Sequence, residues 1–143
     1  MTTNETQLSP IHNNSLGILF LRISIGGLML FHGVNKIIHG IDGIISLTTA
    51  KGFPELMAYG IYIGEVLAPV LILIGFLTRP AAATVAFTMV MSIYLAFGWA
   101  GFELNKHGAP GVELNLMYLI GALALVFTGA GRYSVTKGQG PLN

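Results

Sequence analysis

Cysteine is absent from this chain of 143 residues, and charged side chains make up only 9% of it. Without cysteine the chain has no disulfide, no thiolate metal ligand and no thiol redox chemistry of its own. A soluble domain usually has about 25% charged residues, so the low charge excludes an ordinary soluble protein. Seven Lys and Arg against six Asp and Glu form no basic patch, and we expect no nucleic-acid partner.

Hydrophobic residues take the place of the missing charges, at 53% of the sequence and with a mean hydropathy of +0.72. They gather in four apolar stretches, near residues 16–38, 55–77, 81–99 and 112–131. At about 1.5 Å per helical residue, such stretches match the ~30 Å hydrocarbon core of a bilayer. The sequence therefore predicts an all-α fold, an integral membrane four-helix bundle that runs up-down-up-down, with the lipid bilayer as its first partner.

The polar segments divide the chain into one membrane domain and two ends. Residues 1–15 lack Lys and Arg and do not fit a signal peptide, so we expect them to be retained and poorly ordered. Residues 16–135 form the membrane domain, and residues 136–143 form a flexible tail rich in glycine. Residues 42–50 predict a short helix that lies on the membrane surface, because they are apolar but too few to cross.

Glu65 is the one ionisable group near the middle of the second apolar stretch. A carboxylate at this depth costs roughly 3 kcal/mol or more, so we expect Glu65 to face the bundle interior. Helix rise places Arg22 about 10 Å from it in depth, while His32 is closer but shorter. Pairing with Arg22 would make a structural ion pair; pairing with His32 would allow proton exchange at a functional site. The sequence leaves both readings open.

Other polar residues fall at similar depths in the half of the bundle away from the termini. Lys36 is expected to extend its ammonium group toward the surface, and Glu113 lies where a helix dipole favours an acid. A metal ion needs three or four ligands, so a single deep histidine predicts no metal site. The candidate intramembrane polar site consists of Arg22, His32, Lys36, Glu65, Glu113 and Asn115.

Glycines recur every four residues in the second stretch, at Gly60 and Gly64. Small residues at this spacing let another helix approach closely. We expect the first helix to pack there through Gly26 or Gly33. The same glycines would serve equally well between two protomers of a homo-oligomer.

Four short motifs occur in a fixed order along the chain. Arg22 is followed by His-Gly-x-x-Lys at residues 32–36, Gly-Glu ends at Glu65, Gly-x-x-Thr-Arg ends at Arg79, and Gly-Ala-Gly-Arg-Tyr-Ser covers residues 129–134. In this order they resemble the DoxX family of small bacterial membrane proteins from about residue 16 to residue 135. The family's usual Gly-Pro-Gly-Arg-Tyr appears here with alanine in place of proline.

The resemblance implies a four-helix bundle in the bacterial inner membrane with both termini in the cytoplasm. Members of the family are associated with membrane oxidoreductase assemblies, among them a thiosulfate:quinone oxidoreductase and thiol or oxidative-stress complexes. Quinone is therefore the candidate cofactor, and a soluble or membrane-bound redox protein is the candidate partner. These roles vary within the family, so they are analogies at the level of the fold.

Three functions remain open at the level of the sequence, and with them the question of catalysis. In a quinone-linked subunit, His32 or Arg22 would donate a hydrogen bond to the quinone and Glu65 would take up or release a proton. In a small proton-coupled transporter, Glu65 and His32 would form the relay. In a non-catalytic membrane anchor or scaffold, Glu65 would belong to a dry, fully packed ion pair. A cavity beside Glu65 favours the first two functions.

Overall fold

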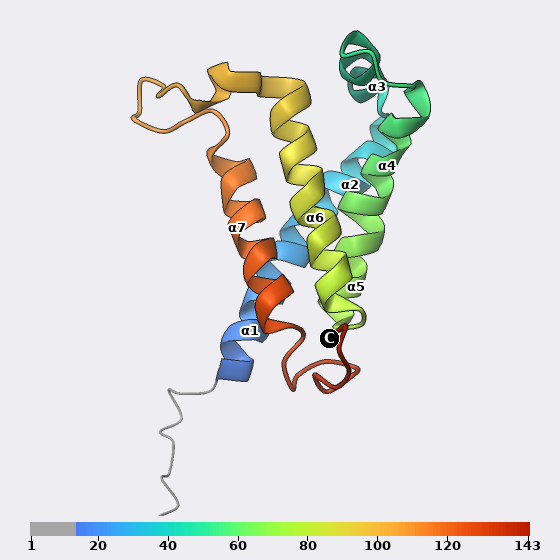
Figure 1. The fold of residues 1–143 in the computed structure, drawn as a ribbon, viewed down its shortest axis with the longest axis vertical. Helices are drawn as coiled ribbons and strands as arrows, with labels where there is room; N and C mark the ends of the chain where they lie inside the picture. The colour runs from blue at the N-terminus through green and yellow to red at the C-terminus, as the bar shows by residue number, and fades with distance from the viewer. Residues whose placement is uncertain (1–13) are drawn as a thin grey trace, which may run out of the picture.

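The structure, a computed structural model, describes residues 14–143 and is mostly helical (Figure 1). The described residues contain no β-strand, only one isolated bridge between Leu104 and Pro110. The predicted all-α membrane bundle is confirmed in its class. Residues 1–13, most of the segment expected to be disordered, lie outside the described residues, and Asn14 and Ser15 already belong to the first helix.

Three long helices contain short irregular turns. The first consists of α1 (Asn14–Arg22), the π-helix η2 (Ile23–Gly27) and α2 (Leu28–His39). The second consists of the 3-10 helix η3 (Glu55–Tyr59), α4 (Gly60–Tyr62), the π-helix η4 (Ile63–Leu67) and α5 (Ala68–Ile74). The third consists of α6 (Thr78–Ser92), the π-helix η5 (Ile93–Phe97) and the 3-10 helix η6 (Gly98–Phe102).

Two shorter helices complete the fold. Helix α3 (Asp42–Ala50) connects the first and second long helices and has the predicted bounds. Helix α7 (Glu113–Thr128) packs along α6. The three long helices have 26, 20 and 25 residues and are apolar enough to cross a membrane. Helix α7 has 16 residues, about 24 Å, so the fourth span stays a prediction.

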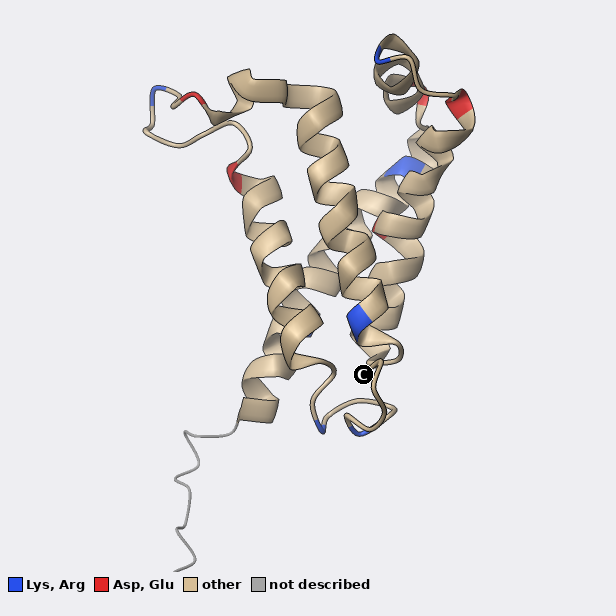
Figure 2. Ribbon diagram, in the orientation of Figure 1, with Lys and Arg blue, Asp and Glu red and all other residues tan. Residues whose placement is uncertain are grey.

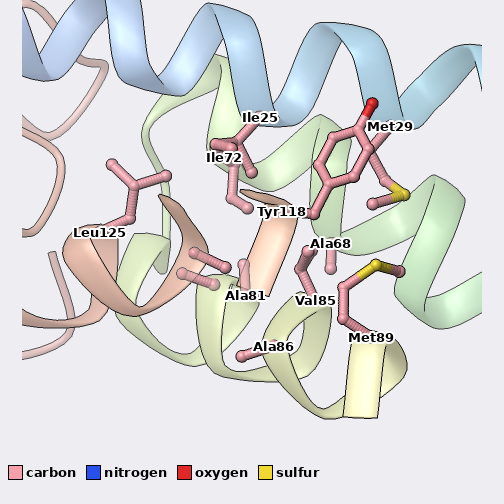
Figure 3. Packing of buried hydrophobic residues seen from close by; sticks show 12 residues of the cluster. Ile25, Met29, Ala68, Ile72, Ala81, Val85, Ala86, Met89, Tyr118 and Leu125 are labelled. Carbon is pink, nitrogen blue, oxygen red and sulfur yellow. The ribbon is translucent and has the colours of Figure 1, made fainter. Parts of the chain in front are cut away.

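The core lies where α5, α6 and α7 meet the first helix (Figure 3). Helix α6 contributes small residues, Ala81, Ala82 and Ala86, and these let its neighbours come close. Larger core side chains such as Ile72 and Leu125 are fully buried between the helices. Bulky apolar side chains also cover the outside of the bundle, with Phe127 78% exposed, as lipid contact requires.

Most charged residues lie at the two ends of the bundle, and the ribbon between them is nearly free of charge (Figure 2). The start of α1 and the C-terminus lie at the same end (Figure 1). The tail that we expected to be flexible lies against this end: the Oγ1 hydroxyl of Thr136 donates to the carbonyl of Gly75 at 3.0 Å, and the N–H of Arg79 donates to the carbonyl of Leu142 at 3.1 Å. The tail therefore contacts the end of α5 and the start of α6.

Candidate functional site

A cavity of about 380 Å³ lies between the first three long helices, with α3 along one side. Most of its wall is apolar; Ile44 and Leu47 of α3 contribute to it, as do residues of the second and third helices. Helix α3 contacts the second helix through η3 and the third through η5, so it forms one side of this partly open cavity. This volume falls within the range of pockets that hold small molecules.

Two charged side chains interrupt the apolar wall, Lys36 of α2 and Glu65 of η4. The Lys36 ammonium donates a hydrogen bond to Oε2 of Glu65, and the two groups form a salt bridge. The Glu65 side chain is 7% exposed and that of Lys36 is 23% exposed. Glu65 faces inward, as expected, but its predicted partners, Arg22 or His32, are wrong. The partner is Lys36, which we expected to extend to the surface.

The backbone explains this pairing. A Cβ placed on Gly33 would overlap the main-chain carbonyl of Glu65, so the first and second helices touch at this point. Lys36 follows Gly33 by three residues, one helical turn, and therefore lies on the same face of α2. The contact brings the base of the Lys36 side chain beside Glu65. The depth estimate alone had no information about which helix faces approach each other.

Arg22 is 1% exposed, and its guanidinium bonds to main-chain carbonyls instead of to Glu65. Its Nε donates to the carbonyl of Ile72 at 2.8 Å, and one terminal nitrogen donates to the carbonyls of Ala130 at 3.0 Å and Tyr133 at 2.6 Å. The other terminal nitrogen donates to the carbonyl of Leu73. The last carbonyls of a helix lack intrahelical donors, and a guanidinium has five N–H groups to offer. Arg22 therefore joins the end of α5 to the segment after α7.

The remaining predicted site residues lie apart from the salt bridge. His32 is exposed, and its ring meets that of Tyr118 edge to face at 6.0 Å between centroids. Asn115 donates to Oγ of Ser92 at 3.1 Å. Glu113 is exposed in the first turn of α7. Of the six predicted residues, the structure brings Lys36 and Glu65 into direct contact, and Asn115 reaches the wall of the same cavity through its bond to Ser92.

The glycines differ from one another in what they contact. Like Gly33, Gly26 of the first helix packs against the second helix. A Cβ on Gly26 would lie 2.9 Å from the Pro69 carbonyl oxygen. Gly64 instead faces Thr88 of α6, and a Cβ on Gly60 would meet nothing within 4 Å. The expected contact of the first helix with Gly60 and Gly64 is therefore wrong. The first helix reaches the second through the neighbouring face at Glu65 and Pro69.

Sequence reasoning missed the polar hydroxyls of the cavity, Thr48, Thr84, Thr88 and Ser92. Isolated Ser and Thr in apolar helices carry no signal, because their hydroxyls usually bond to the preceding turn. The apolar helix predicted for residues 42–50 was the one available hint of a cavity. Across residues 14–143, no group of three His, Asp or Glu could hold a metal ion.

Comparison with known proteins points to a single family. The family model for DoxX matches residues 17–98, more than half of the chain. An uncharacterized protein of Haemophilus influenzae is 28% identical over 120 residues, which is 80% of this chain and 84% of that protein. No solved structure shows a significant match to the chain.

Proposed function

Because the chain belongs to the DoxX family, we propose that it is the membrane subunit of a quinone-linked oxidoreductase assembly and that the cavity beside α3 binds the quinone ring. The observation that carries this proposal is the Lys36–Glu65 salt bridge on the wall of an otherwise apolar cavity. Ionisable groups inside a membrane bundle are costly and typically belong to functional sites. Because Lys36 and Glu65 line the cavity, a ligand bound there would lie within reach of both charged groups.

The residues fit a quinone in three respects. The cavity is large enough for a substituted ring and apolar enough for its faces. Lys36 has three N–H donors and gives one hydrogen bond to Glu65, so it retains donors for a carbonyl oxygen. Glu65 can hold and release a proton at the same place. A bound quinone supplies two-electron, two-proton redox chemistry.

Lys36 and Glu65 have complementary tasks in this proposal. The Lys36 ammonium orients an acceptor oxygen in the cavity and stabilises negative charge that develops on it. As a carboxylate, Glu65 keeps Lys36 in place and is the group that would take up a proton from that oxygen. The chain has no cysteine through which electrons could pass, so we assign the electron donor to a redox partner, soluble or membrane-bound. We place the chain in the bacterial inner membrane with both termini in the cytoplasm.

Ligand binding to the protein in lipid nanodiscs tests the proposal. Decylubiquinone is the probe, and decylbenzene, which has no carbonyl, is the matched ligand. We expect decylubiquinone to bind at least ten-fold more tightly than decylbenzene, because only it can accept hydrogen bonds. Equal affinity for the two would contradict a quinone site and would favour a scaffold with an apolar groove.

Gly60→Leu supplies the matched variant. Gly60 lines the cavity, and nothing lies within 4 Å of a Cβ at this position, so we expect a leucine here to fill part of the cavity without disturbing the fold. We expect this variant to lose decylubiquinone binding and to keep its melting temperature. Gly17→Leu is the control, because Gly17 also has open space around it but lies on α1, far from the cavity. Unchanged binding to Gly60→Leu would place the ligand elsewhere.

A further inference from the structure

Ser92 lies on the cavity wall and has an uncommon hydrogen-bond arrangement. The side-chain amide of Asn115, on α7, donates to its Oγ at 3.1 Å and approaches the sulfur of Met89 at 3.9 Å. An amide nitrogen only donates, so the Ser92 oxygen is the acceptor of this bond. A hydroxyl that accepts in this way still has its own proton to donate.

The other hydroxyls that line the cavity use that proton on their own helix. Thr84 donates to the carbonyl of Pro80 at 2.9 Å, and Thr88 donates to that of Thr84 at 2.9 Å. Thr48 donates to that of Ile44 at 2.7 Å. Within residues 14–143, Ser92 makes no such bond to the preceding turn. Of the hydroxyls that line the cavity, Ser92 therefore has its proton available for a ligand.

Ser92 and Lys36 belong to different walls of the same cavity. Lys36 comes from α2, next to Glu65, whereas Ser92 is the last residue of α6. A ligand between these helices meets a charged donor on one side and a neutral donor on another. Two donors on separate walls match a ring whose two acceptors point in different directions.

We propose that Ser92, oriented by Asn115, is the second hydrogen-bond donor of this cavity, and that the cavity selects a para-quinone through both of its carbonyls. The inference rests on the proposed function and adds a specificity-determining residue to it. In this arrangement Lys36 donates to one carbonyl oxygen and Ser92 Oγ donates to the other. Asn115 acts through Ser92, as a positioning residue that directs the hydroxyl proton into the cavity.

Two ligands and two variants test the inference in nanodiscs. Decylubiquinone has two ring carbonyls, and decylacetophenone has a single carbonyl, which we expect Lys36 to bind. Ser92→Ala should weaken decylubiquinone binding about five-fold, the effect of one hydrogen bond, and should leave decylacetophenone binding unchanged. Thr84→Val is the matched control: Thr84 also lines the cavity, but its hydroxyl already bonds to Pro80, so both affinities should stay the same. An equal loss for both ligands, or no loss, would overturn the inference.

Asn115→Ala separates positioning from packing. We expect it to weaken decylubiquinone binding about two- to three-fold in the wild-type background and not at all in the Ser92→Ala background, because its effect passes through Ser92. Additive losses would show that Asn115 acts by another route and would overturn its assigned role. If Gly60→Leu blocks decylubiquinone but Ser92→Ala does not distinguish the ligands, only this inference fails. If wild-type protein does not bind decylubiquinone, the proposed function fails with it.

Discussion

Gly33 lies directly on the main-chain carbonyl of Glu65, so closely that a single added carbon would overlap the oxygen. This contact joins the first and second helices and places Lys36, one turn further along α2, next to the Glu65 carboxylate. Pro69 contributes from the other side, because it has no N–H with which to bond the Glu65 carbonyl. Glu65 lies in the middle of the π-helix η4, and short π-helical turns often occur at functional sites.

Gly33→Ala should destabilise the protein by about 2 kcal/mol, because the new methyl group forces the helices apart in a packed region. Gly60→Ala should be neutral or stabilise by up to about 1 kcal/mol, because it gains helix propensity in open space. Unfolding of the two variants in detergent, followed by circular dichroism, compares them directly. Equal changes in unfolding free energy for the two substitutions would show that the close contact at Gly33 does not contribute to stability.

The Lys36–Glu65 pair should behave as a coupled unit. Glu65→Gln leaves the Lys36 ammonium without its partner, and Lys36→Met leaves a mostly buried carboxylate. We expect each single variant to lose about 2 kcal/mol of stability, a modest value because Lys36 is partly exposed. The double variant should lose about 1 kcal/mol less than the sum of the two single losses. Strictly additive losses in a double-mutant cycle would show that the salt bridge is energetically unimportant.

The fold followed from the sequence because its signal is strong and local. Long apolar runs fix the helices, and polar or glycine-rich segments fix the loops, so α3 has the predicted bounds and the long helices end within a few residues of those expected. Helix α7 is shorter than the predicted range 112–131 because Gly129, at φ 75°, ends it after Thr128.

The candidate site followed only in part, because partner choice depends on which helix faces meet. The sequence identified Glu65 as the central group and included Lys36 among its neighbours. Depth along the helices could not rank Lys36 above Arg22, because depth does not say which faces of the two helices meet. The close contact at Gly33 decides that. The sequence did not indicate a role for Ser92, because an isolated serine in an apolar helix usually only bonds to the preceding turn. The cavity itself depends on the tertiary placement of α3.

Arg22→Lys should destabilise the protein by about 3 kcal/mol although it keeps the charge. The guanidinium bonds to four carbonyls at once, on α5 and after α7, and an ammonium cannot reach all of them. The carbonyls left unpaired in a buried place account for most of the loss. Arg132→Lys is the control, since Arg132 is exposed. A melting temperature that stays the same in both variants would contradict the role of Arg22 as the link between these segments.

The position of α7 relative to the membrane has a simple consequence for the two loops that flank it. Helix α7 has 16 residues, about 24 Å, so on its own it does not reach across a core of about 30 Å. Its flanking residues can make up the difference, and its packing along α6, a long apolar helix, favours a full crossing. In that case Lys106 and Arg132 lie on opposite sides of the membrane, and Asn14 lies on the side of Arg132.

Cysteine labelling decides this question cleanly, because the natural chain has no cysteine to react in the background. Asn14→Cys, Lys106→Cys and Arg132→Cys each replace an exposed residue. In sealed inverted vesicles from bacterial inner membrane, a maleimide that cannot cross the bilayer should label the variants at positions 14 and 132 and should label position 106 only after the vesicles are opened. Labelling of position 14 alone in the sealed vesicles would show that α7 does not cross, because positions 106 and 132 would then lie on the same side. Labelling of position 106 alone would reverse the proposed orientation.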